Sequence, residues 1–452
     1  MSLSFFNETP MPKTTLHRHR PWLLAALATA ATLAACGGGG DGSSTGSNTL
    51  GGSISGLNTD GLVLANGSDT LAVASGATSF AFDETIGSSY SVTVQSQPNG
   101  QTCQVSHGSG TTSGDVSSVV VTCRGYRVYV ANTNSNTLAQ FSVGSTGALT
   151  ALGTATLGVS FMPSALVVNG DGSRAWLNYR DDETVSVLDI DSSGALSLSS
   201  LSGQAATFGY GLNLSPDESH LYAVNYGGAS VSQFSLGSSG KLTALSTASV
   251  ATGLAPYAMA LTPDGAYAYV ANASDDTLSQ YAVGSGGTLT PLSKATVSVA
   301  SYGSKPQGLA MAPGGNYLYV TLAGSAKVLS YAINPSTGLL TYSSSQSTGT
   351  TPRAIALTSD GTRAYVANAG SATVSQFLVS GGSLTPMATR TVATGSTPSG
   401  IAITPDNARL YVSNAGDGTL SQFSVGAGGA LSALSPATVS TGGLSPVSVV
   451  AR

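Results

Sequence analysis

Four side chains in the C-terminal three-quarters of the chain carry groups suited to the chemistry of a carbonyl. A guanidinium such as that of Arg353 can stabilise the negative charge that develops on a carbonyl oxygen under attack. Tyr257, Tyr210 and Gln307 offer hydroxyl and amide groups that can hydrogen-bond to the same centre. Each of the four follows the start of a predicted β-strand, and this position recurs at Ser164, Tyr210, Tyr257, Gln307, Arg353, Ser399 and Val447. Arg353 is the only charged residue in that series, so it is the first candidate for a catalytic group.

A repeat of about 47 residues positions these side chains. A clear copy, residues 351–379, reads TPRAIALTSDGTRAYVANAGSATVSQFLV. Variants of its Tyr-Val-Ala-Asn strand recur with separations of 47, 46, 47, 50, 46 and 46 residues, anchored at Tyr129, Trp176, Tyr222, Tyr269, Tyr319, Tyr365 and Tyr411. Self-similarity at this period is typical of β-propellers, in which each repeat forms one blade. The seven anchors therefore predict seven blades.

Each unit reads as four antiparallel strands. In one copy the first strand spans residues 256–262, a Pro-Asp-Gly turn follows, and the third and fourth strands lie at residues 277–281 and around 295–299. Asp-Gly turns favour tight reversals, because glycine accepts positive φ and aspartate bonds to nearby backbone. Four strands per unit is the build of a propeller blade. By this strand order, the starts of the first strands and the loops between second and third strands share one mouth of the central channel.

The two ends of the repeat complement each other. The repeat begins at Arg127-Val128-Tyr129, a second strand with no first strand before it, and ends with residues 446–452, a first strand with no second after it. Pairing these strands completes a blade and removes two exposed sheet edges. We therefore predict an all-β, seven-bladed propeller over residues 125–452, closed by its C-terminal strand and destabilised if residues 445–452 are deleted.

Composition narrows the classes of partner. Only 8% of the 452 residues are charged, the formal net charge is −5, and no basic run occurs beyond the first twenty residues, which excludes nucleic acid. The only histidine in the ring is His220, which we place in an exposed turn opposite the mouth. No Ser-His-Asp set and no His or Cys ligand spacing occurs there, so no cofactor is predicted. Two acidic loops, Asp181-Asp182-Glu183 and Asp275-Asp276, are either Ca²⁺ ligands or solvated hairpin tips.

The N-terminal segment has the pattern of a targeting signal. Lys13, Arg18 and Arg20 precede an apolar stretch at residues 22–32 that is too short to span a bilayer. The following Leu-Ala-Ala-Cys resembles the lipobox of bacterial lipoproteins, which implies acylation of Cys36 at the end of a signal over residues 1–36; the alternative is an ordinary secretory signal with an incidental cysteine. The start is Met1 or Met11. Residues 37–49, rich in Gly and Ser, then form a tether.

Cysteine usage and strand pattern define a small region before the ring. With Cys36 lipidated, Cys103 and Cys123 remain as a pair, and export favours a disulfide between them. Residues 50–124 contain short alternating segments separated by Gly, Asn, Asp and Ser turns, at residues 62–64, 70–73, 79–82, 90–95 and 119–123. This spacing suggests a β-sandwich, which resembles the immunoglobulin-like modules of bacterial lipoproteins and would act as a spacer or a docking module.

The repeat itself resembles the YVTN and lactonase-like group of seven-bladed propellers, which includes 6-phosphogluconolactonases. The pattern Pro-x6-Pro-Asp-Gly-x3-Tyr-Val-x-Asn carries this resemblance, most fully at residues 256–272 and nearly so at residues 398–414. Such an enzyme would be expected to place His, Glu or Asp with Arg at the channel mouth. This chain departs from that expectation, because only Arg353 is charged there.

Asparagine and glutamine recur together in five of the seven repeats. Asn132, Asn225, Asn272, Asn368 and Asn414 follow the second strand, and Gln140, Gln233, Gln280, Gln376 and Gln422 lie in the third. Repeats two and five lack both the asparagine and the glutamine. This joint loss favours a structural role, in which the amides satisfy backbone groups at the hairpin, over a ring of amides that binds a ligand.

Two functional classes stay open. The first is a monomeric, lipid-anchored binding scaffold at the outer membrane, cell surface or periplasmic face, with a protein or glycan ligand. The second is a lactonase-like hydrolase that uses Arg353 with Tyr257, Tyr210 or Gln307. The near absence of charged residues at the channel mouth favours the scaffold. The resemblance to lactonase-like propellers suggests the hydrolase as the alternative.

Overall fold

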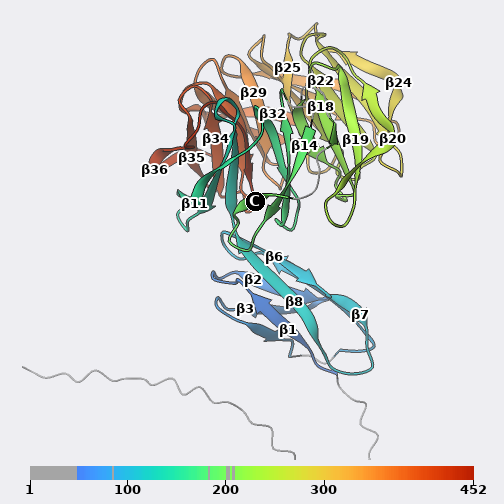
Figure 1. Cartoon of the computed structure of the whole chain (residues 1–452), viewed down its shortest axis with the longest axis vertical. Coiled ribbons are helices and arrows are strands. Elements are labelled where there is room, and N and C mark those ends of the chain that lie inside the picture. Colours follow the sequence, from blue (N-terminus) through green and yellow to red (C-terminus); the bar gives the residue numbers. More distant parts are fainter. Residues whose placement is uncertain (1–47, 84–85, 182–183, 200–203, 206–208) are drawn as a thin grey trace, which may run out of the picture. The chain divides into compact units, whose positions relative to one another are not determined.

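The computed structural model describes residues 48–83, 86–181, 184–199, 204–205 and 209–452, and the regular secondary structure of these residues is β-strand apart from one short 3-10 turn (Figure 1). The predicted signal, Cys36 and nearly all of the tether lie outside the described residues. Within the described part of the chain, no helix has the length and apolar character needed to cross a lipid bilayer.

Two four-stranded sheets form the region before the ring. Their strand orders are β4-β1-β8-β6 and β3-β2-β5-β7. The strands are β1 (Leu50–Ser55), β2 (Leu62–Asn66), β3 (Asp69–Val73), β4 (Ser79–Ala81), β5 (Ser89–Ser96), β6 (Gln101–Ser106), β7 (Ser109–Thr111) and β8 (Val116–Gly125). Five of the eight match the predicted segments, whereas β1, β6 and β7 were not predicted, because their Gly, Ser and Gln content lacks an apolar alternation. The immunoglobulin-like character of this region stays a prediction.

A single apolar core joins these two sheets. Leu50, Leu64, Val119 and Val121 are completely buried within it. Cys103 and Cys123 face each other across β6 and β8 and form the predicted disulfide, buried in the same core.

Seven further sheets follow in chain order and form the blades of the propeller, as far as the residues are described (Figure 1). The first contains β9 (Arg127–Asn132), β10 (Thr137–Val143), β11 (Leu149–Gly158) and the last strand of the chain, β37 (Pro446–Ala451), and a short 3-10 turn, η1 (Thr133–Ser135), joins β9 to β10. The second contains β12 (Pro163–Val168), β13 (Arg174–Tyr179), β14 (Thr184–Ile190), β15 (Leu196–Leu198) and β16 (Gln204–Ala205). The third contains β17 (Gly209–Leu214), β18 (His220–Asn225), β19 (Ser230–Leu236) and β20 (Leu242–Ala251).

The remaining four blades have the same build. They are β21 (Pro256–Leu261), β22 (Tyr267–Asn272), β23 (Thr277–Val283) and β24 (Leu289–Ser298); β25 (Pro306–Met311), β26 (Tyr317–Leu322), β27 (Lys327–Ile333) and β28 (Leu340–Ser347); β29 (Pro352–Leu357), β30 (Arg363–Asn368), β31 (Thr373–Ser380) and β32 (Ser383–Ala393); and β33 (Pro398–Ile403), β34 (Arg409–Asn414), β35 (Thr419–Val425) and β36 (Leu431–Ser440).

The fourth strands are longer than their sequence indicates. β24 begins at Leu289 rather than near residue 295, because it pairs with β23 directly after the hairpin, with Leu289 opposite Val283. Most of its residues are exposed, so it shows little of the apolar alternation by which strands are recognised.

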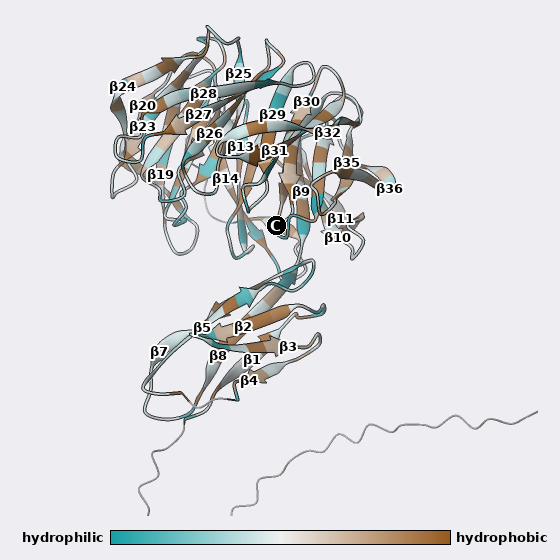
Figure 2. Cartoon of the chain, turned by 180° about the vertical axis from the view of Figure 1, so that it is seen from behind, coloured by the Kyte–Doolittle hydropathy of each residue, from teal (hydrophilic) through white to brown (hydrophobic). Residues whose placement is uncertain are grey.

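The C-terminal strand closes the ring as predicted. β37 pairs with β9 in antiparallel register, with Pro446 opposite Asn132 and Ala451 opposite Val128. Between neighbouring blades, apolar side chains of the second and third strands form successive core clusters, and Figure 2 shows the apolar residues concentrated along the strands.

The anchors of the repeat also join the blades through hydrogen bonds. Tyr269, for example, is completely buried and donates its hydroxyl to the Gly338 carbonyl at 2.7 Å in the next blade. Equivalent bonds are made by Tyr129, Trp176, Tyr222, Tyr365 and Tyr411. The anchors therefore recur once per blade because most of them make a hydrogen bond to the next blade.

Candidate functional site at the mouth of the central channel

The start of each first strand brings one side chain to the mouth of the channel. A residue with positive φ precedes the strand-initiating proline, for example Ala255 (φ 53°) before Pro256 and Thr351 (φ 52°) before Pro352. The carbonyl of that residue accepts a hydrogen bond from the loop between second and third strands, as in Ala273 N–H to Ala255 O at 2.9 Å. The starts of the first strands and the loops between second and third strands therefore lie at the same mouth of the channel, as the strand order predicts.

All seven side chains in the predicted series line one pocket, together with Arg180. Its cavity volume of about 340 Å³ is within the usual range for small-molecule sites. Ser164 and Ser399 are buried in its wall, whereas Tyr210, Tyr257, Gln307, Arg353 and Val447 are partly exposed. The structure thus gathers the four candidate residues in one place, and their catalytic role stays a prediction.

One side of the mouth is aromatic. The Tyr210 ring centroid lies 4.7 Å from that of Tyr257 and 4.7 Å from that of Tyr226. The Arg180 guanidinium carbon lies 4.3 Å from the centre of the Tyr210 ring, a cation–π contact. The three rings are tilted against one another, with interplanar angles of 34° and 46° to Tyr210, so blades two, three and four contribute a cluster of aromatic rings capped by a guanidinium.

Three of the described side chains around the mouth, Arg353 and Gln307 on one side and Arg180 on the aromatic side, have a buried polar atom without a partner. Within the described residues, the buried Nε of Arg353 and the buried Oε1 of Gln307 have no hydrogen-bond partner, and neither has the Nε of Arg180. The ion pairs in the described part of the chain are Arg174–Asp189 and Arg363–Asp360, which involve neither Arg353 nor Arg180. Buried polar atoms are normally paired. Nine other buried side-chain atoms of the described chain also have no partner, among them five asparagine Oδ1 atoms at the blade hairpins, so it is the position of these three atoms at the pocket that makes them candidates to receive a ligand or water.

The electrostatics of the pocket favour a partial negative charge on its ligand. No Asp or Glu is found among the described residues that line it, whereas two guanidinium groups are. Burial raises the pKa of the Tyr257 hydroxyl, and the nearby Arg353 and Arg180 oppose that shift. Tyr257 is therefore a neutral proton donor at physiological pH.

Sequence reasoning missed Arg180, which lines this pocket, and Tyr226, whose ring packs against Tyr210 and Tyr257 beside it. Both occupy the repeat position directly after the second strand, where four other blades have Ala273, Ala323, Ala369 and Ala415. The backbone confirms the equivalence, because Arg180 N–H bonds to Met162 O at 2.9 Å as Ala273 N–H does to Ala255 O. The large side chains of Arg180 and Tyr226, at a repeat position where four other blades have alanine, could have indicated these two residues from the sequence.

The acidic candidates already have partners from the backbone. Asp275 accepts the Leu254 N–H at 2.6 Å, and Asp276 accepts the Lys305 N–H at 2.7 Å. Asp182 and Glu183 lie outside the described residues, and Asp181 is exposed. Within the described chain no three His, Cys, Asp or Glu side chains converge as metal ligands would.

His220 occupies a structural position. It begins β18 rather than lying in the preceding turn, and its ring packs over Gly287 in the next blade. Its Nδ1 lies 2.7 Å from the Ser219 hydroxyl. These contacts keep His220 at the face opposite the channel mouth.

The recurrent amides serve the structure of the blades. Asn272 donates to the hydroxyls of Thr277 and Ser279 within its own hairpin, both at 2.9 Å. Gln280 instead spans two blades, because it donates to Lys294 O at 2.7 Å and accepts from Leu340 N–H at 2.8 Å. The hairpin interpretation therefore holds for the asparagines, whereas the glutamines also bind the neighbouring blade.

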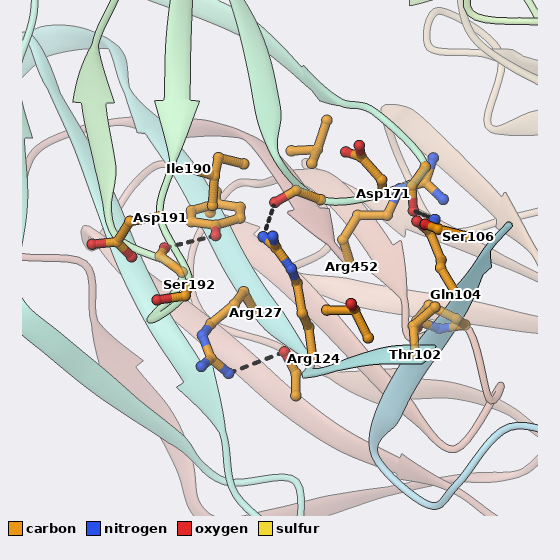
Figure 3. A pocket seen from close by; sticks show the side chains of 18 residues that line it. Thr102, Gln104, Ser106, Arg124, Arg127, Asp171, Ile190, Asp191, Ser192 and Arg452 are labelled. Carbon is orange, nitrogen blue, oxygen red and sulfur yellow. Dashed lines mark hydrogen bonds between the residues drawn. The ribbon is translucent and has the colours of Figure 1, made fainter. Parts of the chain in front are cut away.

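A second pocket lies near the start of the ring, and its polar groups are engaged (Figure 3). The Arg127 guanidinium in this pocket donates to Ser193 O at 3.0 Å, and Tyr129 donates to Gly194 O at 2.7 Å. Asp191 accepts backbone N–H groups of Ser193 and Ala195. Because its groups join neighbouring blades, this pocket is a less suitable ligand site than the channel mouth.

Comparison with known proteins agrees with this architecture. The family described as "Lactonase, 7-bladed beta-propeller" matches residues 212–450, just over half of the chain. The chain belongs to this family. No curated protein sequence is significantly similar to it.

Solved structures share the fold. A protein of Lactobacillus plantarum is 20% identical, with a TM-score of 0.63, over 72% of this chain and 99% of its own. The periplasmic gluconolactonase of Pseudomonas aeruginosa is also 20% identical, with a TM-score of 0.62, over 72% of this chain and 98% of its own. At this level of identity the similarity establishes the propeller fold.

Proposed function

We propose that the protein is a lactonase-type hydrolase whose site is the pocket at the channel mouth. The observation that carries the proposal is the pair of unpartnered buried atoms, Arg353 Nε and Gln307 Oε1, in a pocket that holds no described carboxylate. Membership of the lactonase propeller family and the gluconolactonase neighbour favour this reading over a binding scaffold.

The side chains suit the opening of a cyclic ester. Arg353 can bind the carbonyl oxygen and stabilise the negative charge that forms when water adds to the carbonyl carbon. The free Oε1 of Gln307 can accept a hydrogen bond from that water and orient it. As the bond between the carbonyl carbon and the ring oxygen breaks, the Tyr257 or Tyr210 hydroxyl can protonate the ring oxygen, and the product is a hydroxy acid. The proton lost by the attacking water restores the tyrosine through solvent.

A lactone-hydrolysis assay tests the proposal. Arg353→Ala should lower kcat/KM about 10²- to 10³-fold, because an oxyanion donor is lost. Arg353→Lys should recover part of this activity, since it keeps the charge without the planar fork. The rates are corrected for spontaneous hydrolysis of each lactone.

Arg390→Ala is the matched control, because Arg390 is exposed on β32 and has no hydrogen bond or ion pair within the described chain. It should behave as wild type. If no lactone in a panel of five- and six-membered rings is hydrolysed faster than in buffer, the alternative of a non-catalytic binding protein is favoured.

We further propose that the protein acts outside the cytoplasm as a lipid-anchored monomer. The basic and apolar segments and the lipobox-like sequence before Cys36 support this location. Metabolic labelling with a fatty acid should mark the wild type and leave Cys36→Ser unlabelled.

A further inference from the structure

Exposed apolar side chains gather on the mouth face of the ring. The large hydrophobic residues exposed within the described chain are Phe161, Leu198, Tyr226, Leu254, Leu378 and Leu444, with Phe161, Leu254 and Leu444 exposed by 66%, 59% and 65%. Those three share one repeat position, two residues before the proline that begins a first strand. The Leu254 and Leu444 carbonyls bind the second-to-third strand loops, through Ser274 and Asn134, which places both at the mouth.

This apolar position changes character around the ring. It is Leu444 in blade one, Phe161 in blade two and Leu254 in blade four, and blade three adds the exposed Tyr226. Blades five, six and seven instead have Ser304, Thr350 and Ser396. The mouth face therefore has an apolar sector over blades one to four and a hydroxyl-lined sector over blades five to seven.

The pocket has the same division. Tyr210 and Tyr257, which line it, belong to blades three and four and pack with Tyr226 beside it, whereas Gln307 and Arg353, with their unpartnered atoms, belong to blades five and six. Leu254 lies three residues before Tyr257 in the same connection, so the exposed rim continues into the aromatic cluster. A bound molecule would meet polar groups on one side and apolar surface on the other.

We infer that the substrate is a lactone with an alkyl or aryl substituent, its ring at Arg353 and Gln307 and its substituent over the tyrosines and the apolar sector. This inference rests on the lactonase function proposed above. Covering exposed apolar surface favours such a substituent. A polyhydroxylated lactone fits less well on the side of the tyrosines, because hydroxyls placed there would be buried against ring faces and the apolar sector.

Binding of non-hydrolysable γ-lactams separates this inference from catalysis. Affinity is measured by calorimetry for γ-butyrolactam and for lactams with alkyl chains of increasing length on the ring, beside the lactam analogue of gluconolactone. We expect affinity to rise up to about fourfold for each added methylene that reaches the apolar sector. Equal affinities along the series, or tighter binding of the gluconolactone analogue, would overturn the inference.

Variants locate the effect. Phe161→Ser and Leu254→Ser should flatten the dependence on chain length and leave the binding of γ-butyrolactam unchanged. Leu378→Ser, which alters a leucine exposed by 45% on β31, is the matched control and should keep the wild-type dependence. A wild-type dependence in both rim variants would contradict the placement of the substituent.

The outcomes for the two proposals are distinguishable. Hydrolysis of lactones that depends on Arg353, without any preference for alkyl chains, would support the lactonase and overturn the apolar substituent. A chain-length dependence in lactam binding with no lactone turnover would support the apolar sector and count against the hydrolase.

Discussion

Seven glycines at the hairpins between third and fourth strands each receive a side chain from the preceding blade. All have positive φ, and a Cβ at any of them would collide with the first residue of a second strand. The pairs are Arg409 on Gly147, Arg127 on Gly194, Arg174 on Gly240, His220 on Gly287, Tyr267 on Gly338, Tyr317 on Gly382 and Arg363 on Gly429. Seen in this series, His220 is one of seven contacts that join blades.

Replacement of one such glycine should destabilise the protein. At Gly429, φ is 88° and a Cβ would lie 2.2 Å from Arg363 Cδ, so Gly429→Ala should cost about 1–3 kcal/mol. A Cβ on the neighbouring Gly428 would have nothing within 4 Å, which makes Gly428→Ala the control. Thermal unfolding of both variants checks this; equal melting temperatures would contradict the packing argument.

At the scale of the strand, buried glutamines hold neighbouring blades together. The five occur in the third strands, and each side-chain oxygen accepts the backbone N–H of a leucine that starts a fourth strand in the next blade: Leu196, Leu289, Leu340, Leu431 and Leu149. Blades two and five have Val187 and Ser330 at this position. Ser330 donates a hydrogen bond to Gly382 O at 2.6 Å. In other blades the tyrosine anchor donates to the equivalent carbonyl, and here the hydroxyl of the anchor, Tyr319, has no partner within the described residues.

Removal of one glutamine tests this role. Gln280→Ala leaves the Leu340 N–H and the Lys294 carbonyl without their partner, and each unsatisfied buried group costs about 1–3 kcal/mol. The melting temperature should fall, whereas Gln95→Ala, at an exposed position of β5, should leave it unchanged. A Gln280 variant as stable as the control would show that water replaces the amide.

At the scale of the whole molecule, the ring depends on one non-local strand pair. β37 and β9 lie at opposite ends of the propeller sequence, and Val449 and Ala451 are buried in the core that they share with blade seven. Without β37, the edge of β9 and that core would be exposed to solvent.

Deletion of residues 445–452 should therefore lower the melting temperature of the entire propeller. Val449→Asp should act in the same direction, because it places a charge in an apolar core. Leu444→Ser, at an exposed position next to the strand, is the control. A truncated protein that melts within about one degree of the full chain would contradict closure as a source of stability.

Much of this architecture follows from local patterns in the sequence. The tyrosine period predicts the blade count, and the two incomplete ends predict the closure, because both are patterns of local strands repeated along the chain. The same strand order predicts which residues reach the mouth. The fourth strands were predicted too short, and β1, β6 and β7 were not predicted, since these segments carry little apolar periodicity.

The sequence by itself determined the repeat, the strand that completes it and the series of side chains, including Arg353, that begins each first strand. Only the tertiary structure decided that Arg180 and Tyr226 join Tyr210 and Tyr257 in one cluster, and that Arg353 and Gln307 keep buried atoms without partners. The reason is physical: strand periodicity is a property of local sequence, whereas the contacts at the mouth depend on how separate blades converge around the channel.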